Sequence, residues 1–154
     1  MVTGEISEAT FADALTKKHE VVGLVTQPDR PVGRRQVMTA PRVKEIALEA
    51  GIPLIQPESV GEAGALDQIR QWNPEIIVVM AYGQILPQAL LDIPSKAIIN
   101  LHASLLPKYR GASCIQAALK NGDAETGWSV IHVVKRLDAG TVSYTHLTLP
   151  TTGV

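Results

Sequence analysis

The chain has 154 residues, of which 45% are hydrophobic, and a formal net charge of −1. This length suits a single domain with a sizeable core, and the near-neutral charge excludes a general attraction to nucleic acid. No apolar run approaches the roughly 20 residues that span a bilayer, and residues 1–18 carry acidic side chains where a signal peptide needs a basic start. The single cysteine, Cys114, excludes an internal disulfide and fits a reducing compartment. We therefore expect a cytoplasmic protein with no membrane role.

Helical and strand patterns alternate along the chain, which is typical of an α/β domain with a parallel sheet. In chain order, the patterns predict helix 7–18 with Ser7 as its N-cap, strand 20–26, helix 40–50 ended by Gly51, strand 52–55, helix 63–72, strand 76–81, strand 97–101, helix 114–120 and strand 128–134. The unbroken apolar stretch 76–81 predicts a strand that is buried on both faces. Residues 81–87, with Gly83 and Pro87, indicate a turn from a strand into a helix.

Residues 30–44 form a local basic segment without any acidic residue. Prolines and a glycine interrupt it, which predicts a loop that leads into a helix. Charge alone favours a solvated surface loop over a nucleic-acid contact. The cations of the segment are Arg30, Arg34, Arg35, Arg42 and Lys44.

Asn100 and His102 lie at the end of an apolar run, and Asp138 follows a second apolar run. Residues i and i+2 of a strand point to the same face, so the amide and the imidazole should lie side by side. An amide can stabilise an oxyanion, an imidazole can move a proton, and a carboxylate can orient that imidazole. The Asn-x-His pair alone is nevertheless more often a polar cap on a strand.

Residues 100–111 read Asn-Leu-His-Ala-Ser-Leu-Leu-Pro-Lys-Tyr-Arg-Gly, and Gln116, Asn121-Gly122-Asp123, Thr126-Gly127 and Leu137-Asp138-Ala139-Gly140 follow. This series strongly resembles the formyltransferases that use 10-formyltetrahydrofolate. Residues 25–35, Val-Thr-Gln-Pro-Asp-Arg-Pro-Val-Gly-Arg-Arg, narrow the resemblance to those that act on methionyl-tRNA. The resemblance implies a Rossmann-like, doubly wound, mostly parallel sheet with helices on both faces.

The resemblance also implies a reaction, in which the formyl group of 10-formyltetrahydrofolate passes to the amino group of methionine on initiator methionyl-tRNA through a tetrahedral intermediate. Asn100 and His102 would stabilise the oxyanion, Asp138 would orient His102, and no metal would be needed. Alternatives are formyl transfer to glycinamide ribonucleotide or to an amino-sugar nucleotide, and an inactive fragment that keeps at most folate or RNA binding. We expect a monomer.

The resemblance assigns two sets of binding residues. The basic segment would contact the acceptor stem of the tRNA through Arg30, Arg34, Arg35, Arg42 and Lys44, with Arg34 as the main contact. The folate would lie against Tyr82, Gly83, Gln84, Ile85, Leu86, Ser104, Leu105, Leu106 and Pro107.

The two ends of the chain depart from the family. We expect residues 1–140 to be a partial catalytic domain whose first strand is largely missing. Residues 141–154 contain five threonines and no charged residue, and we interpret them as a foreign or disordered tail. The β-barrel domain that follows in the methionyl-tRNA enzymes, and that also binds tRNA, has no counterpart in these 154 residues.

Overall fold

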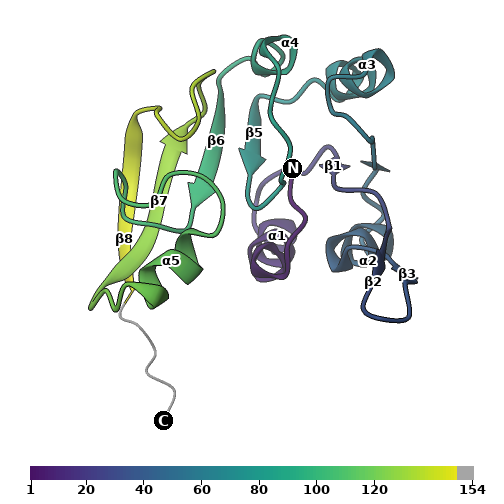
Figure 1. The fold of residues 1–154 in the computed structure, drawn as a ribbon. Helices are drawn as coiled ribbons and strands as arrows, with labels where there is room; N and C mark the ends of the chain where they lie inside the picture. Colours follow the sequence, from purple (N-terminus) through teal and green to yellow (C-terminus); the bar gives the residue numbers. More distant parts are fainter. Residues whose placement is uncertain (149–154) are drawn as a thin grey trace.

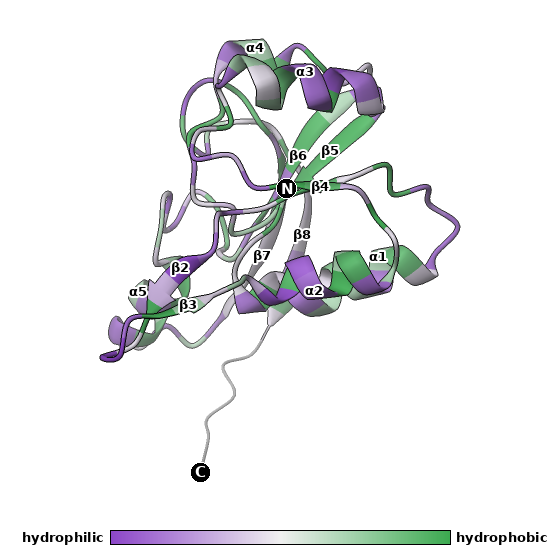
Figure 2. Ribbon diagram, turned by 90° about the vertical axis from the view of Figure 1, so that its right-hand side faces the viewer, coloured by the Kyte–Doolittle hydropathy of each residue, from purple (hydrophilic) through white to green (hydrophobic). Residues whose placement is uncertain are grey.

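The computed structural model describes residues 1–148. A sheet lies in the middle of the molecule, with α1 and α2 on one face and α3 and α4 on the other (Figures 1 and 2). The helical elements are η1 (Glu5–Ser7), α1 (Glu8–Thr16), α2 (Arg42–Glu49), α3 (Ala63–Trp72), α4 (Gln88–Leu91) and α5 (Cys114–Lys120). The strands are β1 (Leu24–Val25), β2 (Arg30–Val32), β3 (Val37–Thr39), β4 (Leu54–Ile55), β5 (Ile76–Val79), β6 (Ala97–His102), β7 (Thr126–His132) and β8 (Val142–Thr148).

The inner part of the sheet is parallel and one edge is antiparallel. β1 pairs in parallel with β4, and β5 pairs in parallel with β6. Val2 joins these two halves, because its amide donates to the Val25 carbonyl (3.1 Å) and it forms a parallel bridge with Met80. β7 and β8 then add antiparallel to β6. The expected doubly wound arrangement with helices on both faces is therefore confirmed, and its first strand is reduced to a single bridge.

Side-chain alternation divides the core between the two faces of the sheet. Val25 and Val79 belong to a cluster with Leu66, Ile69 and Leu90, from the helices α3 and α4. The neighbouring residues in the chain, Leu24 and Met80, belong instead to a cluster with Phe11, Val43 and Ala47, from α1 and α2. This division follows from the period of two along a strand. It explains why each face needs its own pair of helices.

Strand β5 differs from its prediction. The sequence predicts burial on both faces, and this is wrong, since Ile76 is 48% exposed and Val78 is 39% exposed. Both side chains line a second cavity of about 730 Å³, beside the residues that precede β1. Residues 20–23, predicted as strand, are not strand in the structure. Among residues 1–148, the edge of β5 opposite β6 therefore has no paired strand, and only Val2 forms a bridge just beyond it, to Met80.

Ser7 also differs from its prediction. It precedes α1 as expected, but its hydroxyl donates to the Gly4 carbonyl (2.6 Å) and makes no cap hydrogen bond to the helix. The hydroxyl therefore stabilises the turn that leads into the helix, and it does not pair with a free backbone amide in the first turn of the helix.

Residues 142–148 do not behave as the predicted tail. They form β8, which pairs with β7 along six residue pairs from Thr126↔Thr148 to Ile131↔Val142. The prediction of disorder is wrong for this segment, because its valine, tyrosine and threonine residues are strand formers that can pair with the free edge of β7. The remaining part of the predicted tail, residues 149–154, lies outside the described residues.

The predicted basic loop is an antiparallel hairpin. β2 and β3 pair from Arg30↔Thr39 to Val32↔Val37, and the turn between them has Gly33 at φ +72° and Gln36 at φ +49°. The glycine is needed there because a left-handed φ is costly for most residues. Figure 1 shows this hairpin projecting from the body of the molecule beside α2. Among residues 1–148, no helix is long and apolar enough to cross a membrane.

The packing of α4 gives a stability prediction. Leu90 of α4 is completely buried, whereas Leu119 of α5 is 67% exposed. We expect Leu90→Ala to lower the free energy of unfolding by about 2–5 kcal/mol, through lost burial and a residual cavity. Leu119→Ala, the matched control, should change it by less than about 0.5 kcal/mol. Urea denaturation measures both, and equal effects would contradict the packing of α4 described above.

Candidate functional site

The structure brings Asn100, His102 and Asp138 together at the end of β6. The Asn100 amide nitrogen Nδ2 donates to Oδ1 of Asp138 over 3.4 Å. Nδ1 of His102 lies 3.8 Å from Oδ2 of Asp138, and these two side chains are only 7% and 9% exposed. Asn100 and His102 point to one face because they are two positions apart on the strand. The arrangement combines an amide donor, an imidazole and a carboxylate, which is a combination suited to proton transfer beside a developing oxyanion.

Asp138 is held by the backbone around it. Its Oδ2 atom also accepts a hydrogen bond from the Gly111 amide (2.7 Å), and its own backbone is left-handed, with φ +44°. Ala81, Tyr109 and Ser113 are left-handed too, with φ between +50° and +62°, and they lie in or beside the same site. Non-glycine residues with this conformation are uncommon and gather at functional sites.

The second nitrogen of His102 has a separate partner. Nε2 lies 2.8 Å from the backbone carbonyl oxygen of Tyr109, seven residues further along the chain. A carbonyl oxygen can only accept, so Nε2 carries the proton of this hydrogen bond. Nδ1, which faces Asp138, is therefore the nitrogen that is free to gain or lose a proton.

A cavity of about 660 Å³ opens beside these residues. Its lining comes mainly from the last residue of β5 and residues 80–86 after it, from the end of β6, from residues 111–116 and from residues 131–140 without Arg136, and Ile6 and Trp128 complete it. All five of the predicted folate residues between 82 and 86 line it, whereas Ser104, Leu105, Leu106 and Pro107 do not. Ser104 instead donates to the Lys108 carbonyl (2.7 Å), within its own loop.

Two apolar side chains line the cavity with much of their surface uncovered, since Ile85 is 92% exposed and Leu137 is 69% exposed.

Tyr82 is buried in the core, and its hydroxyl has no hydrogen-bond partner within residues 1–148. This burial raises the pKa of Tyr82 to about 12. Tyr82 contributes to the site through its backbone, because its carbonyl accepts a hydrogen bond from Gln27 (2.8 Å).

The five predicted tRNA-binding cations fall into two groups. Arg30 pairs with Glu58 (2.6 Å), Lys44 pairs with Asp29 (2.7 Å), and Arg42 pairs with Glu45. The hydrogen bonds from Lys44 and then Gln56 hold the pKa of Asp29 below its usual value. Arg34 and Arg35, in the turn of the β2–β3 hairpin, are exposed and form no ion pair within the described part of the chain.

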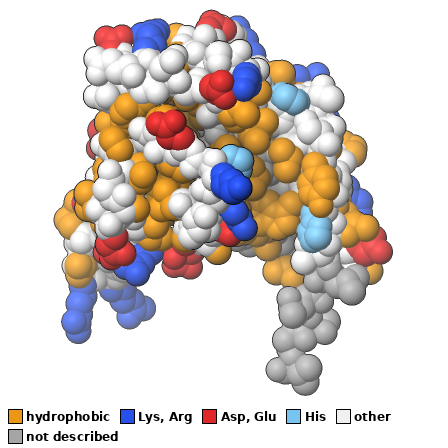
Figure 3. Space-filling view, turned by 180° about the vertical axis from the view of Figure 1, so that it is seen from behind, with side chains coloured by type: hydrophobic (Ala, Val, Ile, Leu, Met, Phe, Trp, Pro, Cys, Tyr) orange, Lys and Arg blue, Asp and Glu red, His pale blue; other side chains and the backbone are white. Residues whose placement is uncertain are grey.

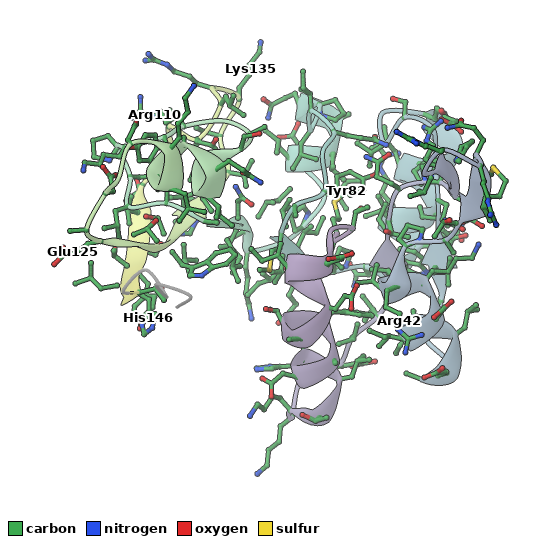
Figure 4. All side chains as sticks on the ribbon, turned by 60° about the horizontal axis from the view of Figure 1, so that its bottom comes forward. Arg42, Tyr82, Arg110, Glu125, Lys135 and His146 are labelled. Atoms are coloured by element: carbon green, nitrogen blue, oxygen red, sulfur yellow. The ribbon has the colours of Figure 1, made fainter. Side chains whose placement is uncertain are left out.

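The distribution of charge is visible on the surface. Figure 3 shows Lys and Arg side chains gathered where the β2–β3 hairpin projects, at the lower left. Arg110 and Lys135 project together from the opposite end of the molecule to Arg42 (Figure 4). No group of three His, Cys, Asp or Glu side chains that is able to hold a metal ion occurs in residues 1–148.

Sequence reasoning assigned no role to several residues that support the site. Tyr109, Gly111 and Asp123 occur in the motif, but only their contacts in space show what they hold. Ser129 of β7, which donates to the Ser104 carbonyl (2.7 Å), carried no sequence signal.

Comparison with known proteins gives consistent matches. The Formyl transferase family model matches residues 2–148. A methionyl-tRNA formyltransferase of Akkermansia muciniphila is 56% identical over 142 residues, which are 92% of this chain and 45% of that protein. One from Staphylococcus aureus strain Newman is 47% identical over 133 residues, or 86% of this chain and 43% of that protein. The chain thus spans less than half the length of these relatives.

Solved structures with the same fold are more distant in sequence. A phosphoribosylglycinamide formyltransferase from Bacillus halodurans has a TM-score of 0.76 at 19% identity, covering 96% of this chain and 77% of that one. A glycinamide ribonucleotide transformylase 1 from Geobacillus kaustophilus has a TM-score of 0.76 at 24% identity, covering 99% and 81%. These likenesses establish the fold.

The segment that carries Asp138 gives a second prediction. A Cβ atom on Gly140 would overlap the backbone carbonyl oxygen of His132, whereas a Cβ on Gly64 of α3 would meet nothing within 4 Å. We expect Gly140→Ala to lower the free energy of unfolding by about 1–3 kcal/mol through overpacking. Gly64→Ala should raise it by up to about 1 kcal/mol, because alanine is the better helix former. Thermal unfolding measures both, and an undisturbed Gly140→Ala variant would refute this close approach.

Proposed function

Because the chain belongs to the formyl transferase family, we propose that it transfers a formyl group from 10-formyltetrahydrofolate to the methionyl amino group of initiator methionyl-tRNA. The observation that carries this proposal is the assembly of Asn100, His102 and Asp138 beside an apolar cavity. The names of the two relatives support the choice of acceptor. We further propose that residues 1–140 are a partial catalytic domain.

The cavity has the properties that a folate needs. Its volume of about 660 Å³ lies within the range of about 300–1,000 Å³ that is typical of small-molecule sites. Residues 82–86 would hold the pterin ring, through backbone groups for its polar edge and through Ile85 and Leu86 for its flat faces. The bound folate supplies the formyl carbon that the acceptor amine attacks. Ser104–Pro107 are not part of this proposal, because they do not line the cavity.

Asn100 and His102 would meet the negative charge that develops on the formyl oxygen. Asn100 uses one N–H of its amide for Asp138, which leaves the second N–H for the oxyanion. His102 can donate to that charge only through Nδ1, once Nδ1 has taken the proton of the attacking amine, since its Nε2 proton is committed to the Tyr109 carbonyl. Both groups are held in place before the substrate arrives, so little reorganisation is needed during the reaction.

Asp138 would stabilise a positive charge on His102. Its Oδ2 atom is 3.8 Å from Nδ1, and both side chains are almost completely buried, where the attraction between opposite charges is only weakly screened. A proton taken from the attacking amine can therefore rest on the His102–Asp138 pair before it reaches the departing nitrogen. In stabilising the charged imidazole, Asp138 has one of the two roles of the carboxylate in a catalytic triad.

The β2–β3 hairpin favours methionyl-tRNA over a smaller acceptor such as glycinamide ribonucleotide or an amino-sugar nucleotide. A small acceptor would not reach a projecting hairpin, whereas an RNA stem presents a row of phosphates. Arg34 and Arg35 are the cations of the segment that remain free for such phosphates. We propose that these two residues contact the RNA, and that Arg30 and Lys44 hold the hairpin in position, whereas Arg42 is paired with Glu45 within α2.

Replacement of Asn100 tests the proposed chemistry. Asn100→Ala should lower kcat for formyl transfer to methionyl-tRNA by a factor on the order of 10²–10³, the usual cost of one oxyanion donor. Binding of a stable formyl-folate analogue, followed as a rise in melting temperature, should persist. Gln71→Ala, which removes an exposed amide from α3, is the matched control and should leave kcat unchanged. Full turnover by Asn100→Ala would exclude the proposed role.

Replacement of the two turn arginines tests the proposed acceptor. The double variant Arg34→Ala, Arg35→Ala should weaken tRNA binding and make the slope of log K against log salt shallower by about two, one for each lost phosphate contact. Affinity for the formyl-folate analogue should not change. Arg70→Ala on α3 removes an arginine that is paired with Asp67, and it should leave the slope as it is. A parallel loss of folate affinity would mean that the hairpin serves the folate site and not the RNA.

A further inference from the structure

Tyr109 connects the candidate active site with a group of polar residues that lies outside it. Its hydroxyl donates to Oδ2 of Asp123 (2.8 Å) and accepts a hydrogen bond from Nδ2 of Asn121 (2.8 Å). Its backbone carbonyl, at the other end of the residue, accepts the hydrogen bond from Nε2 of His102 (2.8 Å). One residue therefore links the turn after α5 with the imidazole.

The backbone of Tyr109 needs such an anchor. Its φ is +54°, a left-handed conformation that L-residues with a large side chain rarely adopt. The two hydrogen bonds of the ring hydroxyl hold the residue in this conformation from the outer side of the loop. Asp123 is additionally 3.6 Å from Nζ of Lys108, so the acceptor of the tyrosine hydroxyl is itself fixed.

Two buried serines hold the inner side of the same loop. Ser104 donates to the Lys108 carbonyl (2.7 Å), and Ser129 donates to the Ser104 carbonyl (2.7 Å), with both serines completely buried. Ser129 also accepts a hydrogen bond from the Leu106 amide (3.1 Å). The Ser104 hydroxyl also approaches the Tyr109 carbonyl oxygen over 3.4 Å, with the Lys108 carbonyl as its closer acceptor. The direction of the Tyr109 carbonyl therefore depends on this long contact and on the anchor at the ring hydroxyl.

The direction of this carbonyl decides which nitrogen of His102 carries the proton in the neutral ring. A neutral imidazole has one N–H donor and one acceptor nitrogen, and the hydrogen bond made by one nitrogen fixes the role of the other. With the carbonyl at Nε2, the proton stays there and Nδ1 is the acceptor beside Asp138. Without it, Asp138 would draw the proton to Nδ1, and the lone pair of the ring would then lie on Nε2 and not beside Asp138.

We propose that Tyr109 is a positioning residue, which Asn121 and Asp123 anchor so that its backbone carbonyl keeps neutral His102 protonated on Nε2 and leaves Nδ1 as the proton acceptor. The kinetic consequence of this inference rests on the proposed formyl transfer. The structural consequence, the tautomer of His102, does not depend on any activity.

The tautomer is measured on the 154-residue chain labelled with ¹⁵N in its histidine rings. The ¹⁵N shifts of neutral imidazole distinguish a protonated Nε2 from a protonated Nδ1, and His102→Gln identifies the signals of His102 among the four histidines. Wild-type protein should show His102 protonated on Nε2. Tyr109→Phe, which keeps the ring and removes both anchoring hydrogen bonds, should shift the signals towards protonation on Nδ1. A wild-type ring protonated on Nδ1, or unchanged signals in Tyr109→Phe, would overturn the proposal.

Tyr144→Phe is the matched control, since Tyr144 is 58% exposed on β8 and its hydroxyl only approaches the His146 ring. It should leave the His102 signals unchanged. Asp123→Asn weakens the same anchor while the tyrosine ring remains intact, and it should shift the signals in the same direction as Tyr109→Phe. If Tyr109→Phe does not fold, Asp123→Asn and the wild-type tautomer decide the question.

Kinetics separate this proposal from the proposed function. In formyl transfer, Tyr109→Phe should lower kcat on the order of ten-fold, as expected for a displaced catalytic group, with the KM for the formyl donor within about two-fold of wild type. An equal rise in KM would indicate damage to the cavity and contradict a positioning role. If wild-type protein does not transfer formyl groups but Tyr109→Phe shows the expected tautomer shift, the proposed function fails and the role of Tyr109 remains.

Discussion

The carboxylate of Asp138 is the point on which the candidate site depends. It is almost completely buried, and a buried carboxylate is stable only with several donors around it. Its donors come from separate parts of the chain, namely the Asn100 side chain on β6 and the Gly111 amide at the end of the following loop, with the His102 ring nearby. One charged group thereby ties the end of a strand, a loop and the segment after β7 to each other. Residues 111–113 of this loop and residues 133–140 of this segment, except Arg136, also line the cavity.

The sheet explains why these donors meet there. β5 and β6 run in parallel, so the residues that follow β5 and the last residues of β6 reach the same edge of the sheet. Residues 80–86 form one wall of the cavity, and Asn100 and His102 stand beside it. The antiparallel β7 ends opposite Ile99, and the loop after it brings Asp138, six residues further on, back to Asn100 and His102.

Local patterns in the sequence predicted those parts of the structure that depend on local interactions. Helix 63–72 has the predicted bounds, because its apolar spacing fits one face of a helix and Asn73 ends it in a left-handed conformation. Asn100 and His102 were correctly predicted to share a face from the period of two. The proximity of Asp138 came from the resemblance and not from its spacing, since no periodicity connects positions in different segments.

The incorrect predictions have physical causes. Residues 30–39 contain glycine and proline, which mark turns, and the pairing of β2 with β3 around that turn is not visible in composition. Residues 142–148 alternate between apolar and polar side chains only as far as Thr145, and their pairing with the free edge of β7 is not visible in so short a pattern. The anchoring of Tyr109 by Asn121 and Asp123 joins two irregular segments, where local patterns give no information on contacts.

Hydrogen bonds connect the hairpin to the cavity. At the base of the hairpin, Gln56 donates to both Asp29 (2.7 Å) and the Gln27 carbonyl (2.9 Å). The Gln27 side chain then donates to the Tyr82 carbonyl (2.8 Å) and accepts a hydrogen bond from Gln84 (3.3 Å). Gln27 and Gln56 therefore link the segment that would hold the pterin to the base of the hairpin that would hold the RNA. Since pre-organised groups lose less freedom on binding, this shared support lowers the cost of placing both substrates correctly.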